Sequence, residues 1–280
     1  MRDAVVTRFA PSPTGFLHIG HAYAAFFAAE KAKSSGGTFL LRIEDIDQSR
    51  CRDIYLDGIY KDLEWLGLHW EHPIRFQSNN MDDYQKALDK LKRQGIIYPC
   101  FCTRKEIKAE IKRAGGAPHG EEETVYPGLC RTLTPEIREK KLNSALPYAF
   151  RLNVKKALKL VGELTWTDVI KGKQKVEPSG LGDIVIARKD TPTSYHLAVT
   201  IDDAIQGVTL VTRGEDLSLS TSIHRLIQSL LGLEAPTYYH HRLFMGSNGT
   251  KLSKRDETMT IRFLRHSGKT PEDIKRMVGM

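Results

Sequence analysis

The first 43 residues alternate between short apolar runs and a helical stretch. Residues 4–9 predict a buried strand, which the proline- and glycine-containing segment 11–15 ends. Residues 19–33 are rich in alanine and lack proline, so they predict a helix, which the glycines at 36 and 37 close. Residues 38–43 predict a second strand. This order predicts an α/β fold with a parallel sheet, whose ligand site lies at the carboxyl ends of the strands.

The chain beyond residue 43 continues the α/β pattern, but its residue composition changes after Tyr98. Residues 99–175 hold three of the four cysteines and a glycine-rich linker, and they predict a subdomain inserted into the sheet domain. We therefore expect a first catalytic half over 1–98, the insertion over 99–175, a second half over 176–249, and a loop with a short helical tail over 250–280. Helices are predicted over 55–66, 81–94, 195–205 and 220–231, and strands over 183–187 and 207–211.

Composition narrows the class of protein. No run of 18 apolar residues is present, which excludes a membrane span. Four cysteines in 280 residues are too few for a disulfide scaffold, so we expect a reducing cytoplasm. Residues 100–175 carry 16 basic against 9 acidic side chains, and residues 250–280 carry 8 against 4. This clustering predicts a face that binds a polyanion, the alternative being two well-solvated surfaces.

The turn after the first predicted strand leads directly into a pair of histidines. His18 and His21 are three residues apart, so both can lie on one face of the first helical turn. That end of a helix offers free N–H donors and suits a phosphate, and Gly20 leaves room for a nucleotide to approach the backbone. The alternative is that the two histidines only cap the helix or fill the core.

A second group of cations follows a glycine-bearing loop near the end of the sequence. Lys251, Lys254 and Arg255 lie within five residues and predict a clamp for a leaving pyrophosphate. Alone, such a run is more often a solvated loop. The pairing with the histidine motif favours the catalytic interpretation.

Together these two strings resemble the HIGH and KMSKS signatures of class I aminoacyl-tRNA synthetases. Residues 8–12 and 42–47 match the glutamyl branch of that family. The resemblance implies a Rossmann-type fold that uses ATP with Mg²⁺ to join L-glutamate to AMP. The acyl group then passes to a nucleic-acid hydroxyl.

The resemblance also implies roles for individual residues. Arg213 or Arg8 can fork onto the substrate carboxylates and Glu44 can hold the α-ammonium group. The alternative for 42–47 is an acidic helix cap. The catalytic residues implied are His18, His21, Lys251 and Lys254, and the ATP contacts are His18, Gly20, His21 and Lys254. The glutamate pocket implied comprises Arg8, Phe9, Ala10, Pro11, Ser12, Glu44, Tyr195 and Arg213.

Two departures from the full-length pattern point to a shortened branch. Only 25 residues follow Arg255, so we expect no anticodon-binding domain, and Val199 stands where the longer synthetases have asparagine. Both features resemble the glutamyl-Q tRNA(Asp) synthetases, which activate glutamate without tRNA and attach it to the queuosine base at the wobble position of tRNA(Asp). The resemblance therefore implies docking at the anticodon loop. The alternatives are a truncated glutamyl-tRNA synthetase that charges a 3′ end, a small-molecule nucleotidylyltransferase, and an idle RNA-binding paralogue.

The inserted segment carries a candidate metal site. Three cysteines beside a glycine-rich loop in a cytoplasmic chain predict one tetrahedral, structural Zn²⁺, or else free structural thiols. The shortened branch uses the pattern Cys-x-Cys…Tyr-x₃-Cys, which implies Cys100, Cys102, Tyr126 and Cys130 as ligands. The gap before the tyrosine is long, so His119 stays the alternative fourth ligand.

Overall fold

The computed structural model describes residues 4–113, 126–177, 182–244 and 257–280. It begins with the expected strand, helix and strand: β1 (Val6–Phe9), α1 (Ile19–Ser34) and β2 (Thr38–Ile43). The two strands are parallel, with Arg8 opposite Leu40. After α2 (Asp53–Trp65), a third parallel strand, β3 (Glu71–Phe76), extends the sheet to the order β1-β2-β3.

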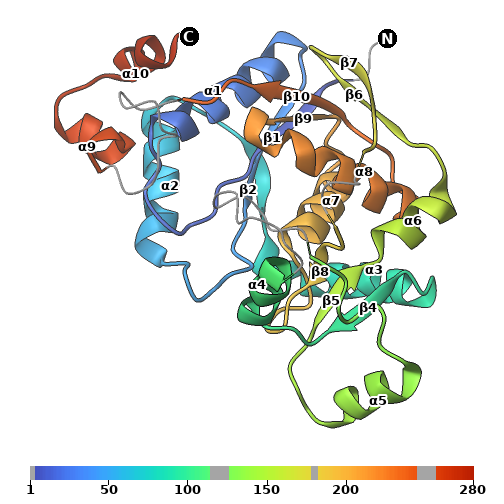
Figure 1. Ribbon diagram of the computed structural model, residues 1–280. Helices are drawn as coiled ribbons and strands as arrows, with labels where there is room; N and C mark the ends of the chain where they lie inside the picture. The colour runs from blue at the N-terminus through green and yellow to red at the C-terminus, as the bar shows by residue number, and fades with distance from the viewer. Residues whose placement is uncertain (1–3, 114–125, 178–181, 245–256) are drawn as a thin grey trace.

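A second sheet continues the first on the other side of β1. It has the order β7-β6-β10-β9, and only β7 is antiparallel to its neighbour. The Thr209 N–H donates to the Val6 carbonyl oxygen at 3.0 Å, so β9 runs beside β1 (Figure 1). The strand order β3-β2-β1-β9-β10 therefore reverses between β1 and β9, as in doubly wound nucleotide-binding sheets. The strands are β6 (Thr165–Asp168), β7 (Gly172–Lys175), β9 (Leu210–Gly214) and β10 (Thr237–His241).

A third sheet contains part of the inserted segment. β4 (Ile97–Cys100), β5 (Ala149–Leu152) and β8 (Val185–Ala187) form an antiparallel sheet in the order β4-β5-β8. The segment 99–175 thus shares strand pairing with its neighbours, through β5 to β8 and through β6 to β10. The division of the chain into four parts stays a prediction. The helices of this region are α3 (Met81–Arg93), α4 (Arg104–Arg113), α5 (Pro135–Asn143) and α6 (Val154–Val161).

The remaining helices cover the sheets. α7 (Tyr195–Ile205) and α8 (Ser218–Leu231) share an apolar core with α3, and α9 (Ile261–His266) and α10 (Pro271–Val278) join the core of α1 and β2 (Figure 1). Short 3₁₀ turns lie at Gln77–Asn80, Glu215–Leu217 and Glu257–Met259. In the described part of the chain, no helix is long and apolar enough to cross a membrane.

Two expected strands are shifted. The strand expected over 207–211 begins at Leu210, because Gly207 has a φ of 62° and the Val208 N–H closes the end of α7 on the Asp203 carbonyl. The strand expected from residue 183 begins at Val185. The Asp183 carboxylate is occupied by the Tyr98 hydroxyl at 2.6 Å, which holds that residue outside the ladder.

Candidate functional site

Two arginines mark the point where the sheet order reverses. Arg8 lies on β1 and Arg213 on β9, and both are buried, at 8% and 6% exposure. Arg8 NH1 donates to the Thr212 carbonyl oxygen at 3.2 Å and so bridges the two strands. Ligands of doubly wound sheets bind at this switch point, which makes the two arginines the floor of a candidate site.

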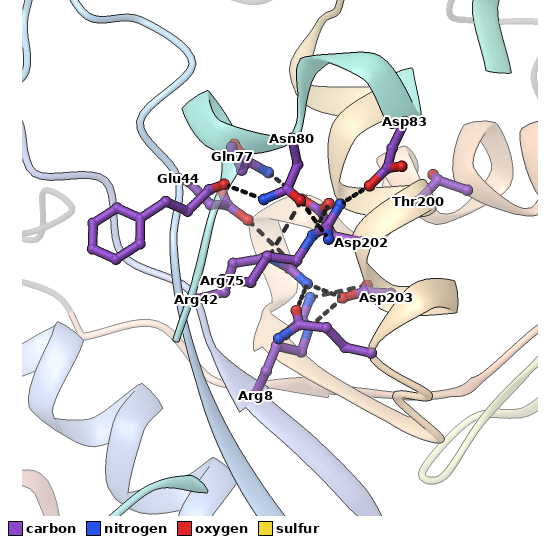
Figure 2. A network of polar contacts seen from close by, with 12 residues as sticks. Arg8, Arg42, Glu44, Arg75, Gln77, Asn80, Asp83, Thr200, Asp202 and Asp203 are labelled. Carbon is purple, nitrogen blue, oxygen red and sulfur yellow. Dashed lines mark hydrogen bonds and ion pairs between the residues drawn. The ribbon is translucent and has the colours of Figure 1, made fainter. Parts of the chain in front are cut away.

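A buried aspartate fixes Arg8 and a neighbouring arginine (Figure 2). Arg8 Nε donates to Asp203 Oδ1 at 2.8 Å, and Arg42 NH1 donates to the same oxygen at 2.7 Å. Burial alone would raise the pKa of Asp203, but the ion pairs with Arg8 and Arg42 lower it. Arg42 NH2 also donates to Glu44 Oε1 at 3.3 Å. Asp203 thereby holds Arg8 directly and holds Glu44 through Arg42.

The neighbouring aspartate braces the other side of the network (Figure 2). Asp202 is fully buried and accepts hydrogen bonds from Arg75 Nε at 2.7 Å, Gln77 Nε2 at 2.8 Å and the Tyr84 hydroxyl at 2.9 Å. Sequence reasoning missed Asp202, Asp203 and Arg42. The available signal was a pair of acidic residues in an otherwise apolar stretch of predicted helix.

A cavity of about 590 Å³ opens beside this network. The Glu44 N–H donates to the Pro11 carbonyl oxygen at 3.0 Å, which joins the end of β2 to the turn after β1. Burial raises the pKa of Glu44 despite the adjacent Arg42. The cavity walls include three of the expected pocket residues, Ser12, Glu44 and Tyr195, together with His196 and Arg188.

Not every expected pocket residue lines the cavity. Phe9 packs in the apolar core, and Arg8 and Arg213 lie in the buried floor. A larger cavity of about 780 Å³ lies elsewhere, between α1, Trp70 and Lys275, and contains none of the expected site residues. We therefore place the site in the smaller cavity.

The two histidines of the first motif lie together at the start of α1. The Gly20 N–H donates to His18 Nδ1 at 3.1 Å and the His18 N–H donates to His21 Nδ1 at 3.1 Å, so both rings cap the helix. Their ring centroids are 3.8 Å apart. Because each Nδ1 accepts, each ring carries a proton on Nε2. A Cβ on Gly20 would lie 3.0 Å from the His18 ring, so glycine gives this ring its place.

The second motif falls outside the described residues, and with it Lys251 and Lys254. Its flanks are described. Phe244 packs against Tyr23 of α1, with ring centroids 4.8 Å apart. Thr260 forms a β-bridge with His18. Both flanks of 245–256 therefore lie beside the first turns of α1.

The cysteine cluster borders the cavity, since Tyr126 and Arg151 line both. Cys102 and Cys130 have their sulfurs 3.4 Å apart, and the Tyr126 hydroxyl oxygen is 3.4 Å from Cys100 Sγ. Zinc–sulfur bonds of about 2.3 Å place tetrahedral ligand atoms about 3.8 Å apart, so this donor set fits a metal. Arg151 Nε lies 3.3 Å from Cys100 Sγ and would offset thiolate charge. His119 lies outside the described residues.

Comparison with known proteins decides the family. The family model described as "tRNA synthetases class I (E and Q), catalytic domain" matches residues 4–280. The chain belongs to this family. The resemblance inferred from the two motifs is thereby confirmed, as is a parallel-sheet α/β catalytic domain of the class I synthetases.

Individual relatives carry two different names. A glutamyl-Q tRNA(Asp) synthetase of Rhodobacter capsulatus is 43% identical, over 99% of this chain and 100% of the relative. A glutamate–tRNA ligase of Coprothermobacter proteolyticus is 42% identical over 96% of this chain, which spans only 56% of that relative. The crystal structure of a glutamate-tRNA synthetase from Elizabethkingia anophelis superposes with a TM-score of 0.83 at 30% identity, covering 99% of this chain and 61% of that one.

Proposed function

We propose that this chain activates L-glutamate with ATP and Mg²⁺, without tRNA, and transfers the glutamyl group to the queuosine base at the wobble position of tRNA(Asp). In the first step, a carboxylate oxygen of glutamate bonds to the α-phosphorus of ATP and the bond to pyrophosphate breaks. In the second step, a hydroxyl of queuosine attacks the acyl carbon and AMP leaves. We place both steps in the cytoplasm, because four cysteines without a disulfide are typical of a reducing compartment.

The observation that carries the glutamate part is that Glu44 lies in the cavity wall and Arg213 is buried behind it. Arg213 lies under the cavity wall and suits a substrate carboxylate, while Glu44 in the wall suits the α-ammonium group. A carboxamide would leave the buried guanidinium unpaired, which disfavours glutamine. Nε2–H donors of His18 and His21 would bind phosphate oxygens at the start of α1. Lys251 and Lys254 would hold the departing pyrophosphate.

The two named relatives are similarly identical to this chain, but they differ in how much of their length it covers, and this difference favours tRNA(Asp) as the acceptor. The Rhodobacter relative matches this chain over its full length and is named for tRNA(Asp) and the Q nucleoside. Arg104 and Arg151 of the basic segment 100–175 line the cavity, and the basic side chains of this segment would contact the RNA backbone. A Zn²⁺ on Cys100, Cys102, Tyr126 and Cys130 would stabilise this part of the fold.

Transfer of labelled glutamate tests the proposal. Purified protein, ATP and Mg²⁺ are incubated with tRNA from normal cells and from cells that cannot make queuosine. We expect label on the first pool alone, located in the anticodon fragment after ribonuclease digestion. Equal label on the 3′-terminal nucleoside of both pools would instead establish a glutamyl-tRNA synthetase that charges the acceptor end.

A further inference from the structure

Arg213 is held by side chains that carry no charge. Its Nε donates to His240 Nε2 at 3.3 Å, its NH1 lies 3.1 Å from His224 Nδ1, and its NH2 donates to the Thr221 hydroxyl. The other three arginines of the network, Arg8, Arg42 and Arg75, each lie against an aspartate. Within the described residues, no carboxylate forms an ion pair with Arg213. Its partners therefore orient the guanidinium without neutralising it.

These contacts fix the direction of every hydrogen bond around Arg213. A guanidinium has only donors, so the ring nitrogens that face it must accept. The proton of His240 is therefore on Nδ1, which lies 2.7 Å from Asp168 Oδ2. The proton of His224 is on Nε2, which lies 3.1 Å from His196 Nδ1. His196 Nδ1 therefore accepts from His224 Nε2–H, so the proton of His196 is on its own Nε2.

Charge and burial keep the histidines neutral, as this arrangement requires. Burial together with the charge of Arg213 lowers the pKa of His196 to about 4 and lowers that of His224 well below its ordinary value. Burial also lowers the pKa of His240, although the bond to Asp168 opposes it. At neutral pH each ring then has one donor and one acceptor.

These hydrogen bonds form a continuous string from Asp168 through His240, Arg213 and His224 to His196, which lies at the cavity. Asp168, at the end of β6, accepts from the backbone N–H groups of Ile170 and Lys171 at 2.8 and 2.9 Å. From there it runs through β10 and β9 to α8 and then to α7, which stand next to one another in Figure 1. At its far end, His196 lines the cavity beside Tyr195 and Glu44.

We propose that His196 is a specificity-determining residue, which donates its Nε2–H to a carboxylate oxygen of the bound amino acid. Asp168, His240 and His224 are positioning residues that fix its tautomer and the direction of the Arg213 guanidinium. The inference rests on the proposed function, since it takes an amino-acid carboxylate to be the ligand. A carboxamide that turned its NH₂ group toward His196 would meet a donor. The ring cannot change tautomer to accept it, because His224 would then present a proton to Arg213.

The tautomers can be measured without any assay of activity. Long-range ¹H–¹⁵N spectra of the full chain with ¹⁵N-labelled histidine, assigned by single His→Gln variants, report which ring nitrogen carries the proton. We expect Nε2–H for His196 and His224 and Nδ1–H for His240 between pH 6 and 8. A proton on Nδ1 of His224, or a charged ring there, would overturn the string.

Two variants of His224 separate positioning from general damage. His224→Leu removes one of the three acceptors of Arg213, so KM for glutamate should rise about ten- to a hundredfold while KM for ATP stays unchanged. His224→Asn restores a carbonyl oxygen near the place of Nδ1 and should recover most of the affinity. The exposed His69→Gln is the control and should behave as wild type. Equal effects of His224→Leu and His224→Asn on both substrates would show a structural role only.

Substrate choice tests His196 itself. In glutamate- and glutamine-dependent ATP–pyrophosphate exchange, His196→Phe should lower the ratio of kcat/KM for glutamate over glutamine at least about tenfold. An unchanged ratio would overturn the role of His196 while leaving glutamate activation intact. If wild-type protein activated neither amino acid, the proposed function would fail, and the role of His196 with it. The NMR tautomers would still decide whether the string exists.

Discussion

Arg8 and Thr212 tie the two sheets together across the strand reversal, through a hydrogen bond of 3.2 Å from NH1 to the carbonyl oxygen. Arg8 also lies on Asp203 of α7. One candidate binding residue therefore links β1, β9 and a helix. The stability of the fold and the shape of the site depend on the same buried charges.

Removing the charge of Asp203 should destabilise the whole chain. Asp203→Asn leaves Arg8 and Arg42 buried without the carboxylate they share, and such losses cost about 3–5 kcal/mol. Urea unfolding followed by circular dichroism measures the change. Asp89→Asn is a matched control, because Asp89 pairs with Lys92 at the surface, and it should leave the free energy of unfolding close to that of wild type. A free energy of unfolding for Asp203→Asn within 1 kcal/mol of wild type would contradict the network.

A buried carboxyl on α2 should make stability depend on pH. Asp62 is fully buried, and neither of its oxygens has a hydrogen-bond partner among the described residues, although Arg265 NH2 lies 3.4 Å away. Burial raises the pKa of Asp62 to about 6. The folded chain thus binds this proton more tightly than the unfolded chain, so stability falls as pH rises from about 4 to about 6.

The size of this effect follows from the shift in pKa, at about 1.4 kcal/mol per unit. Between pH 4.5 and 7.5, wild type should lose about 2 kcal/mol of unfolding free energy relative to Asp62→Asn. Denaturant unfolding at a series of pH values provides the comparison. Parallel curves for the two proteins would show that Asp62 titrates normally.

The cysteine cluster should hold one zinc ion after purification. Cys100→Ser should lower zinc affinity at least about tenfold and lower Tm, because structural zinc contributes folding free energy. Tyr126→Phe keeps the three thiolates, so it should lower zinc affinity and Tm less than Cys100→Ser does. Metal analysis and thermal unfolding with a chelator are the measurements, with Cys51→Ser as the control that keeps full zinc content. A wild-type protein without zinc would rule out the site.

Lys254 should act on the activation step. Lys254→Ala should reduce glutamate-dependent ATP–pyrophosphate exchange by about a hundredfold or more, if the ammonium group stabilises charge on the leaving pyrophosphate. Lys269→Ala, an exposed lysine between α9 and α10, should keep the wild-type rate. Exchange by Lys254→Ala at the wild-type rate would remove that role.

The first α/β unit could be predicted because its apolar runs, turn and alanine-rich helix agree at every level. The strand β3 was missed, since Glu71, Pro73 and Arg75 hide its period. The strand β10 was not predicted either; His240 and His241 are buried in it, and His240 is bonded to Asp168. Asp168 and His240 are 72 residues apart in the sequence, so no local sequence pattern predicts their contact.

The site residues divide along the same line. Residues within a motif, such as His18 and His21, could be predicted to lie side by side, because their spacing sets their geometry. Asp202 and Asp203 were missed, because an acidic pair on a helix ordinarily faces water and only the apolar residues around it indicated burial. This acidic pair supports the pocket because the arginines of β1, β2 and β3 form ion pairs with it.

The bridge from His18 to Thr260 has a consequence for the order of events during protein synthesis. The ribosome releases the histidine pair early, but Thr260, which pairs with His18, emerges only after the strands of all three described sheets have been translated. A nascent chain can therefore build β1, α1 and β2 while the start of α1 still lacks this backbone contact. The bridge between His18 and Thr260 can therefore form only after the residues of the preceding sheets have been synthesised.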